Sequence, residues 1–317
     1  MSVNANRSGA DIQGVVPVLS TPFRPDDEAV DYDALARLVD FTAALDVGAF
    51  CLPAYAGEFY KLSDAERLEV VKAAVGFSRG RLPVVAQSNH PSAKVAADLA
   101  RRNADAGADV IAFAMPRMYP VSQGDLLDYC TTMCRAVNLP ILVQDYNPGG
   151  PTVGAEFCAR LLEACPNFRY IKLEEPLMGP KVVEIRRATA EKVGVFEGWG
   201  GQYMLELIPA GICGSIPGAC NADVLALVWR RAKEGKTDEA LDAFEMILPQ
   251  ITYALQTWEL YLQLEKRLLV SRGVLPNATV RRPTWTIDPE VIAYGEMLNQ
   301  RVLKALDKLG LPRNPAA

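Results

Sequence analysis

Eight short apolar segments alternate with helical patterns, and this alternation constrains the fold most strongly. The patterns between them repeat every 3.6 residues or so, as amphipathic helices do. Alternating strands and helices form a parallel sheet, and eight strands can close into a TIM barrel. An open doubly wound sheet is the alternative, but no Gly-rich dinucleotide fingerprint follows the first segment. The apolar segments span residues 15–19, 49–53, 83–87, 110–115, 141–145, 170–173, 193–196 and 211–216.

The sequence divides into three parts on this interpretation. We expect residues 1–12 to form a mobile tail, residues 13–235 the barrel and residues 236–317 an appended helical segment. The fold class is therefore α/β, a (β/α)8 TIM barrel with about three further C-terminal helices. Those helices are predicted at residues 238–255, 258–272 and 289–309.

Charge and composition exclude several classes of function. A net charge of −5 gives no sign of a basic surface that would bind nucleic acid, and it disfavours binding to an anionic membrane surface. No apolar run approaches the roughly 18 residues that span a bilayer, and the polar start does not resemble a signal peptide. The seven cysteines form no C-x-x-C pair, which is typical of reduced thiols in a cytoplasmic protein.

His90 is the only histidine, which excludes a His-rich metal site. A Ser-His-Asp hydrolase would have to use this one residue, and a magnesium site made of carboxylates stays open. We expect no metal and no other cofactor. Catalysis is then expected from lysine, tyrosine or a carboxylate.

Lys172 lies in the sixth apolar segment. Because side chains alternate along a strand, Tyr170, Lys172 and Glu174 are expected to point into the barrel, and Ile171 and Leu173 toward the helices. An apolar interior disfavours the charged amine, so the pKa of Lys172 should fall, and a neutral amine can condense with a ketone. The simpler alternative is that Lys172 only pairs with Glu174.

Tyr146 follows the fifth segment and, by the same alternation, faces inward together with Gln144. A phenol beside an imine-forming lysine can move protons, although Tyr146 could also only pack inside the barrel. After the second segment, Gly57 allows close approach of the backbone. The amides of Ala56 and Gly57 could therefore hold a carboxylate.

Trp199 lies in the glycine-rich stretch 197–201, which follows the seventh segment and is expected to open a helix. A helix N-terminus at this position in a barrel can bind phosphate or carboxylate. We favour contact with the distal end of a substrate over a phosphate site. Packing by Trp199 is the structural alternative.

Several motifs resemble those of the dihydrodipicolinate synthase / N-acetylneuraminate lyase family. The segment Gly57-Glu58 matches the end of that family's Gly-Thr-Thr-Gly-Glu loop, and Gly214–Gly218 occupies the place of its eighth-strand segment. The motifs keep the family's order and spacing over nearly the whole chain. The others are Thr21-Pro-Phe23, Tyr146-Asn147 and Tyr170-Ile-Lys172.

The resemblance implies a TIM barrel assembled as a homo-oligomer, usually a tetramer, although a dimer stays open. It implies that Lys172 forms an imine with pyruvate or a longer 2-keto acid and that Tyr146 is the proton-transfer phenol. The loop at Ala56-Gly57 would hold the substrate carboxylate, and Ile216 would line the pocket.

The sequence departs from the family pattern at two places near this site. Tyr55 and Ala56 stand where the family loop has two threonines, so a hydroxyl that normally passes protons to the tyrosine is altered. Met118 stands where many members have a tyrosine that reaches into the neighbouring subunit. Tyr119 is one position away and is the candidate to replace it.

A further departure concerns the substrate. The sequence after Asn147 lacks the arginine with which dihydrodipicolinate synthases bind the carboxylate of their second substrate, which argues against lysine biosynthesis. The reactions that remain are dehydration and aldol cleavage of a sugar-derived 2-keto-3-deoxy acid. Gln144-Asp145 and the glutamates after Lys172, Glu174 included, resemble branches that dehydrate such acids, for instance 2-keto-3-deoxyarabonate.

The sequence therefore predicts a class I lyase that acts on a small-molecule 2-oxo acid through Lys172. A non-catalytic keto-acid-binding paralogue is one alternative, because the loop threonines and the arginine are missing. A barrel enzyme that carries pyridoxal phosphate on the same lysine is another. The individual 2-oxo acid, and the choice between dehydratase and aldolase, stay open.

Overall fold

The computed structural model describes residues 11–118, 120–148 and 150–317. Eight parallel strands form one curled sheet in the order β1-β8-β7-β6-β5-β4-β3-β2. A parallel bridge between Val18 and Cys51 joins the two ends of this sheet, so the barrel closes. The strands are β1 (Gly14–Val15), β2 (Phe50–Leu52), β3 (Val84–Gln87), β4 (Val110–Ala114), β5 (Ile141–Asp145), β6 (Phe168–Leu173), β7 (Gly194–Glu197) and β8 (Gly214–Ser215).

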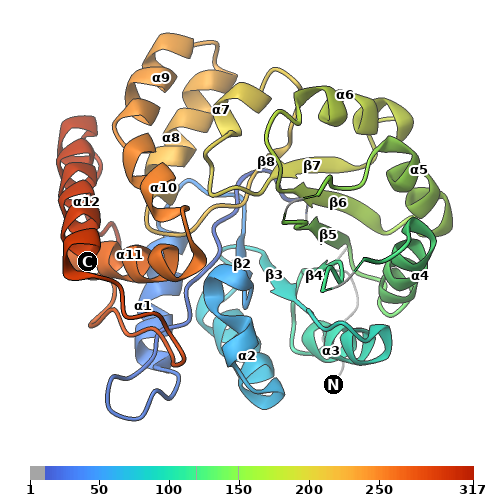
Figure 1. Cartoon of the computed structure of the whole chain (residues 1–317), viewed down its shortest axis with the longest axis horizontal. Helices are drawn as coiled ribbons and strands as arrows, with labels where there is room; N and C mark the ends of the chain where they lie inside the picture. Colours follow the sequence, from blue (N-terminus) through green and yellow to red (C-terminus); the bar gives the residue numbers. More distant parts are fainter. Residues whose placement is uncertain (1–10, 119, 149) are drawn as a thin grey trace.

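Helices surround the sheet, as the (β/α)8 prediction requires (Figure 1). Two short 3-10 helices, η1 (Tyr55–Gly57) and η2 (Phe59–Lys61), follow β2. The barrel helices are α1 (Tyr32–Ala43), α2 (Asp64–Ser78), α3 (Ala93–Asp105), α4 (Gln123–Cys134), α5 (Ala155–Ala164), α6 (Gly179–Ala188), α7 (Met204–Leu207) and α8 (Ala222–Lys233). None of the helices in the described ranges is both long and apolar enough to cross a membrane.

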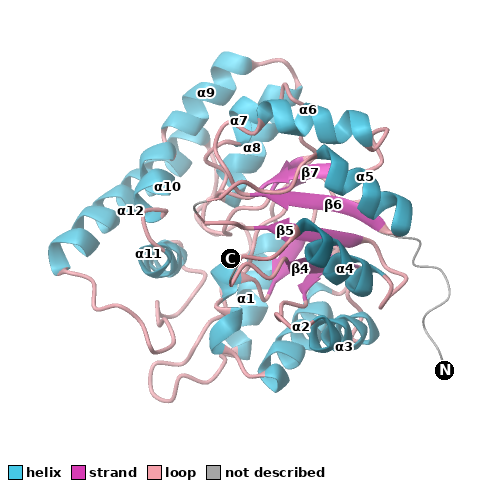
Figure 2. Ribbon diagram, turned by 45° about the vertical axis from the view of Figure 1, so that its right-hand side comes forward, coloured by secondary structure: helices cyan, strands magenta, loops and turns pink. Residues whose placement is uncertain are grey.

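The C-terminal segment contains one helix more than predicted. The pattern at 238–255 is two helices, α9 (Thr237–Glu245) and α10 (Leu248–Ala254), followed by α11 (Trp258–Ser271) and α12 (Pro289–Leu309). Pro249 lies in the first turn of α10, where proline is tolerated, and it cannot continue a helix that began before it. These helices gather on one side of the barrel, and α11 contacts η1 at the carboxyl ends of the strands (Figure 2).

The predicted alternation of side chains along the strands is confirmed. Leu142 of β5 and Tyr170 of β6 pack inside the barrel, in one buried cluster with Cys51 and Phe196. Ile171 and its neighbours on the other face pack against the helices. The alternation also determines which side chains reach the mouth of the barrel.

The predicted N-terminal tail lies outside the described residues up to position 10. Asp11 and Ile12 are held against the barrel, because the Tyr170 hydroxyl donates to Asp11 Oδ1 (2.6 Å) and accepts from the amide of Ile12 (3.0 Å). The break between α8 and α9 falls at residues 234–236, where our proposed division of the chain places the end of the barrel.

Candidate active site

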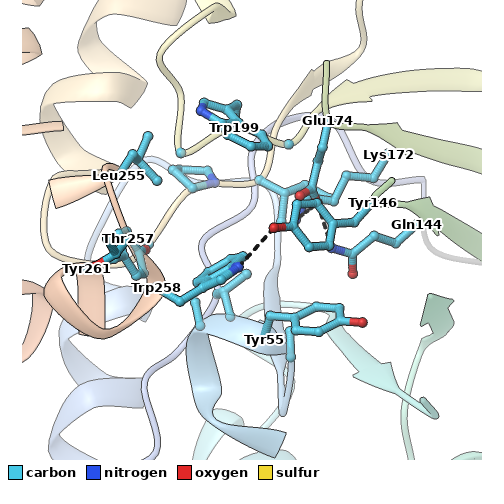
Figure 3. Close-up of a pocket in the computed structure, with 18 of the residues that line it drawn as sticks. Tyr55, Gln144, Tyr146, Lys172, Glu174, Trp199, Leu255, Thr257, Trp258 and Tyr261 are labelled. Atoms are coloured by element: carbon cyan, nitrogen blue, oxygen red, sulfur yellow. Dashed lines mark hydrogen bonds and ion pairs between the residues drawn. The ribbon is translucent and has the colours of Figure 1, made fainter. Parts of the chain in front are cut away.

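A pocket of about 180 Å³ opens at the carboxyl ends of the strands (Figure 3). Strand ends, barrel loops and the C-terminal helix α11 all contribute to its wall. Among the described residues it is lined by Val18, Ala54, Tyr55, Ala56, Gln144, Tyr146, Lys172, Glu174, Gly198, Trp199, Gly200, Ile216, Pro217, Gly218, Leu255, Gln256, Thr257, Trp258 and Tyr261.

Lys172 is buried in this pocket (6% exposed) at the end of β6. Its Nζ lies 3.0 Å from Oε1 of Glu174, so the ion pair that the simpler alternative predicts is present. The same carboxylate oxygen accepts from Gln144 Nε2 (2.5 Å), and Gln87 Nε2 donates to the oxygen of Gln144 (3.1 Å). Burial raises the pKa of Glu174, and Lys172 and Gln144 oppose this shift.

Gly198 leaves the space that the lysine chain occupies. A Cβ at this position would lie 2.5 Å from Cγ of Glu174 and 2.6 Å from Cε of Lys172. Side chains in a packed interior cannot accommodate such contacts without moving. Glycine after β7 is therefore a condition for the lysine to reach the pocket along its present path.

Glu197 fixes the glycine-rich loop that follows β7. Its buried carboxylate accepts from the amides of Trp199 (2.7 Å) and Gly201 (3.0 Å) and from the hydroxyl of Ser215 (2.5 Å). Burial raises the pKa of Glu197, and the hydrogen bonds from Ser215 and Trp199 oppose the shift. The expectation that residues 197–201 open an anion-binding helix is wrong. The helix α7 begins only at Met204, and Glu197 already engages two of the amides.

Tyr146 faces the pocket just beyond β5, as predicted. Its hydroxyl accepts a hydrogen bond from Nε1 of Trp258 (3.1 Å), the first residue of α11. The Tyr146 ring also lies against Tyr55 (centroids 5.7 Å apart) and Trp199 (6.1 Å). Figure 3 shows Trp258 across the dashed hydrogen bond from Tyr146, with Lys172 and Glu174 on the same side of the pocket as Tyr146.

The sequence prediction missed Trp258. Its helix reads as an ordinary amphipathic pattern, in which a tryptophan is expected to be a core residue. Its position at the start of the helix could have indicated a role outside the core. Trp258 is the first residue of α11 and directly follows Thr257. The Thr257 side chain caps the helix by accepting a hydrogen bond from the amide of Leu260 (3.2 Å).

The loop after β2 lines the pocket only in part as expected. Ala56 and Tyr55 are in the wall, whereas Gly57 lies behind them and its amide already donates to Ala54 O (3.0 Å). The prediction that the Gly57 amide holds a carboxylate is therefore wrong. A Cβ on Gly57 would lie 2.9 Å from the carbonyl oxygen of Leu19, so this glycine permits a close backbone contact instead.

The remaining predicted residues separate into two groups. Ile216 and Trp199 line the pocket. Met118 does not line it and is 76% exposed, and Tyr119 lies outside the described residues. Within the described ranges, no group of three or more histidine, cysteine, aspartate or glutamate side chains could hold a metal ion.

Fold and pocket together define an α/β-barrel enzyme with a buried lysine, a carboxylate and a phenol at the mouth of the barrel. Residues 11–296 match the model of the Dihydrodipicolinate synthetase family. The chain belongs to this family, as its short motifs predicted, and it is a lyase.

Relatives of two kinds are similar to this chain. L-2-keto-3-deoxyarabonate dehydratase of Azospirillum brasilense is 26% identical over 304 residues, which cover 92% of this chain and 96% of that protein. 4-Hydroxy-tetrahydrodipicolinate synthase of Sorangium cellulosum is 37% identical over 164 residues, 51% of this chain and 54% of that protein. In fold, the chain resembles dihydrodipicolinate synthase of Rhodopseudomonas palustris with a TM-score of 0.85, at 24% identity over 91% of this chain and 97% of that one.

Proposed function

We propose that this chain dehydrates a sugar-derived 2-keto-3-deoxy acid through an imine on Lys172. The observation that carries the proposal is the arrangement at the barrel mouth. The Lys172 amine lies in an enclosed pocket, 3.0 Å from a carboxylate and next to the strand that carries Tyr146. One relative that is similar to this chain over nearly its whole length is named as a dehydratase of such an acid, which supports dehydration over synthesis.

Imine formation needs a neutral amine and a proton for the departing oxygen. Glu174 is placed to take a proton from the Lys172 ammonium, because its Oε1 is in direct contact with Nζ. The nitrogen lone pair then attacks the C2 carbonyl, and a proton passes from the nitrogen to the oxygen to give a neutral carbinolamine. Tyr146 protonates the hydroxyl of this intermediate, which leaves as water, while the nitrogen lone pair forms the C=N bond.

Dehydration follows from the electron demand of the protonated imine. The released water first carries the proton held by Glu174 to the Tyr146 phenolate, which restores the carboxylate and the phenol. Glu174 then removes a proton from C3, the electrons of that bond form the C2=C3 bond of an enamine, and the C=N electrons return to the nitrogen. The enamine electrons then expel the C4 hydroxyl, which leaves as water with a proton from Tyr146, and a C3=C4 bond forms. Burial raises the pKa of Glu174 and so makes this carboxylate a better base at this step.

The pocket also favours a substrate with a single carboxylate. Lys172 is the only lysine or arginine among the described residues that line the pocket, and its charge lies at the ketone end of the substrate, where the imine forms. The carboxylate next to the ketone has the backbone at Ala56 as its proposed partner. A second carboxylate at the far end would lie near Trp199 and Trp258 without a cation, which is costly in a desolvated site. A diacid of equal length should therefore show a KM at least about tenfold higher than the monoacid.

The decisive test is trapping of the imine. Borohydride added in the presence of pyruvate should add the mass of the reduced ligand to Lys172, and the Lys172→Ala variant should show no adduct. A panel of 2-keto-3-deoxy acids should then give turnover with a dehydrated product. No adduct with any ligand in the panel would refute the proposal. An adduct on Lys172 without turnover would instead identify a keto-acid-binding paralogue.

A further inference from the structure

We propose that Trp258 is a positioning residue for Tyr146, supplied by the C-terminal helix of the same chain. The inference rests on the proposed function, because it concerns the phenol that moves protons there. The indole Nε1 donates to the Tyr146 hydroxyl at 3.1 Å, and both side chains line the pocket with Lys172 (Figure 3).

The direction of this hydrogen bond decides what the phenol can do. An indole N–H is a donor only, so the oxygen of Tyr146 must accept. The hydroxyl proton of Tyr146 is then directed away from Trp258. Tyr146 is thereby held as a proton donor toward the space in which the carbinolamine oxygen of the proposed reaction would lie.

The indole is itself held in place from several sides. It stacks on Tyr55 (ring centroids 5.9 Å apart, planes 25° apart) and meets Tyr261 edge to face at 5.9 Å. Its backbone begins α11, where the Thr257 side chain caps the helix. An indole packed in this way can hold the phenol in one orientation, and such fixed geometry is what proton transfer requires.

The hydrogen bond also accounts for the altered loop beside Tyr146. Tyr55 stands where the family loop has a threonine, and its ring lies against the Tyr146 ring at a tilt of 59°. Met118 is largely exposed and takes no part in the pocket. In the part of the chain that the structure describes, the Tyr146 hydroxyl has the Trp258 indole as its hydrogen-bond partner.

The test is a double-mutant cycle of Trp258→Phe and Tyr146→Phe. The rate of imine formation with pyruvate is measured by borohydride quenching and mass spectrometry, and kcat and KM are measured for a 2-keto-3-deoxy acid. Trp258→Phe keeps an aromatic ring but removes the N–H. It should lower the rate of imine formation and kcat by about 10- to 100-fold and change KM by less than about threefold.

The cycle separates positioning from general packing. In the Tyr146→Phe background, Trp258→Phe should have less than about a twofold further effect, because the hydroxyl that it positions is gone. Trp199→Phe is the matched comparison, since its ring lies against the phenol ring (centroids 6.1 Å apart) and, among the described residues, makes no hydrogen bond to the phenol oxygen. Its effect should be similar in both backgrounds. Equal effects of Trp258→Phe in both backgrounds would overturn the proposal.

Three further outcomes are informative. If Trp258→Phe does not fold, the indole N–H signal of ¹⁵N-labelled Trp258 is compared between the native chain and Tyr146→Phe; a shift is expected, and an unchanged signal overturns the proposal. If the native chain forms no adduct at all, the proposed function fails together with this inference. If the native chain forms the adduct and Trp258→Phe does so equally fast, only the role of Trp258 fails.

Discussion

The carboxylate of Glu58 and the ammonium of Lys266 form an ion pair at 2.5 Å, and both side chains are almost wholly shielded from solvent. Glu58 directly follows η1, which lines the pocket, and has a left-handed backbone (φ 57°), whereas Lys266 lies on α11. The amide of Arg281 donates to the other carboxylate oxygen (3.1 Å), and Lys61 lies 3.2 Å from it. The C-terminal segment thus holds the loop that we propose binds the substrate carboxylate.

Lys266→Met should weaken both the fold and the pocket. The change leaves the buried Glu58 carboxylate without its ion pair to Lys266. Removing one partner of a buried ion pair lowers the free energy of unfolding by about 3–5 kcal/mol. We expect a loss of this order in urea unfolding and a KM for the keto acid raised at least about fivefold. Glu58→Gln in the same chain should restore part of the stability, because it removes the carboxylate charge that Lys266 no longer balances.

The matched control for this variant is Lys72→Met. Lys72 pairs with Glu69 at 2.8 Å on the exposed face of α2, where both side chains are about half exposed. An exposed pair of this kind contributes little, so the change should cost less than about 0.5 kcal/mol. Comparable losses in the two variants would contradict the structural role of Lys266.

Gly198→Ala should prevent normal placement of Lys172. The added methyl would lie within 2.6 Å of both the Lys172 and Glu174 side chains, so one of them must move. Because a displacement of about 1 Å can cost about 100-fold in rate, we expect at least that loss in the rate of imine formation. Gly76→Ala on α2 is the control, since a Cβ there meets nothing within 4 Å; it should keep full activity and add about 0.5–1 kcal/mol of stability.

The pH dependence of turnover should report Glu174. Burial raises the pKa of this carboxyl above its ordinary value of 4.5. On acidification, the carboxylate is therefore protonated at a pH above 4.5. The kcat profile should therefore fall on its acid side above pH 4.5. In Glu174→Gln, kcat should drop by about 100-fold or more and the acid limb should disappear. If the acid side of the kcat profile is unchanged in this variant, another group causes the loss of activity at low pH.

The pH dependence of stability should report Glu66. Arg281 binds both oxygens of Glu66 (2.7 and 3.0 Å), and the hydrogen bond to Arg281 is the main reason that the pKa of Glu66 falls from 4.5 to about 2. A lowered folded pKa stabilises the fold above pH 4.5, and this contribution is lost as the pH falls toward 2. Glu66→Gln should cost about 1–2 kcal/mol at pH 7, allowing for its partial exposure. The difference from the native chain should vanish near pH 2, as measured by urea unfolding at each pH.

Strand-borne residues of the site could be predicted from the sequence, because the twofold alternation of a strand determines which side chains face inward. Lys172, Glu174, Gln144 and Tyr146 were placed correctly on this basis. Trp258 and Lys266 could not be placed in the same way. They lie on α11, and the periodicity of a helix shows that it has a buried face without showing which part of the barrel that face meets.

Two errors have a common physical cause, namely local hydrogen bonds that a pattern does not reveal. The Gly57 amide is used within its own turn, and Glu197 caps the loop that looked like an anion site. In both cases, a backbone donor that the sequence suggested for a ligand already has a partner from the chain. Pro249 is different, since its effect on the predicted helix could have been recognised from the sequence alone.

The position of α11 limits how this active site can be transferred to another protein. A chain shortened to end before Thr257 would keep every strand and the Lys172 side chain, but it would lose the N–H that holds the phenol and one of the two lysines that neutralise Glu58. Grafting the lysine strand onto another barrel would likewise transfer the nucleophile without its surroundings. A designer who borrows this catalytic centre must therefore carry a distant helix along with it.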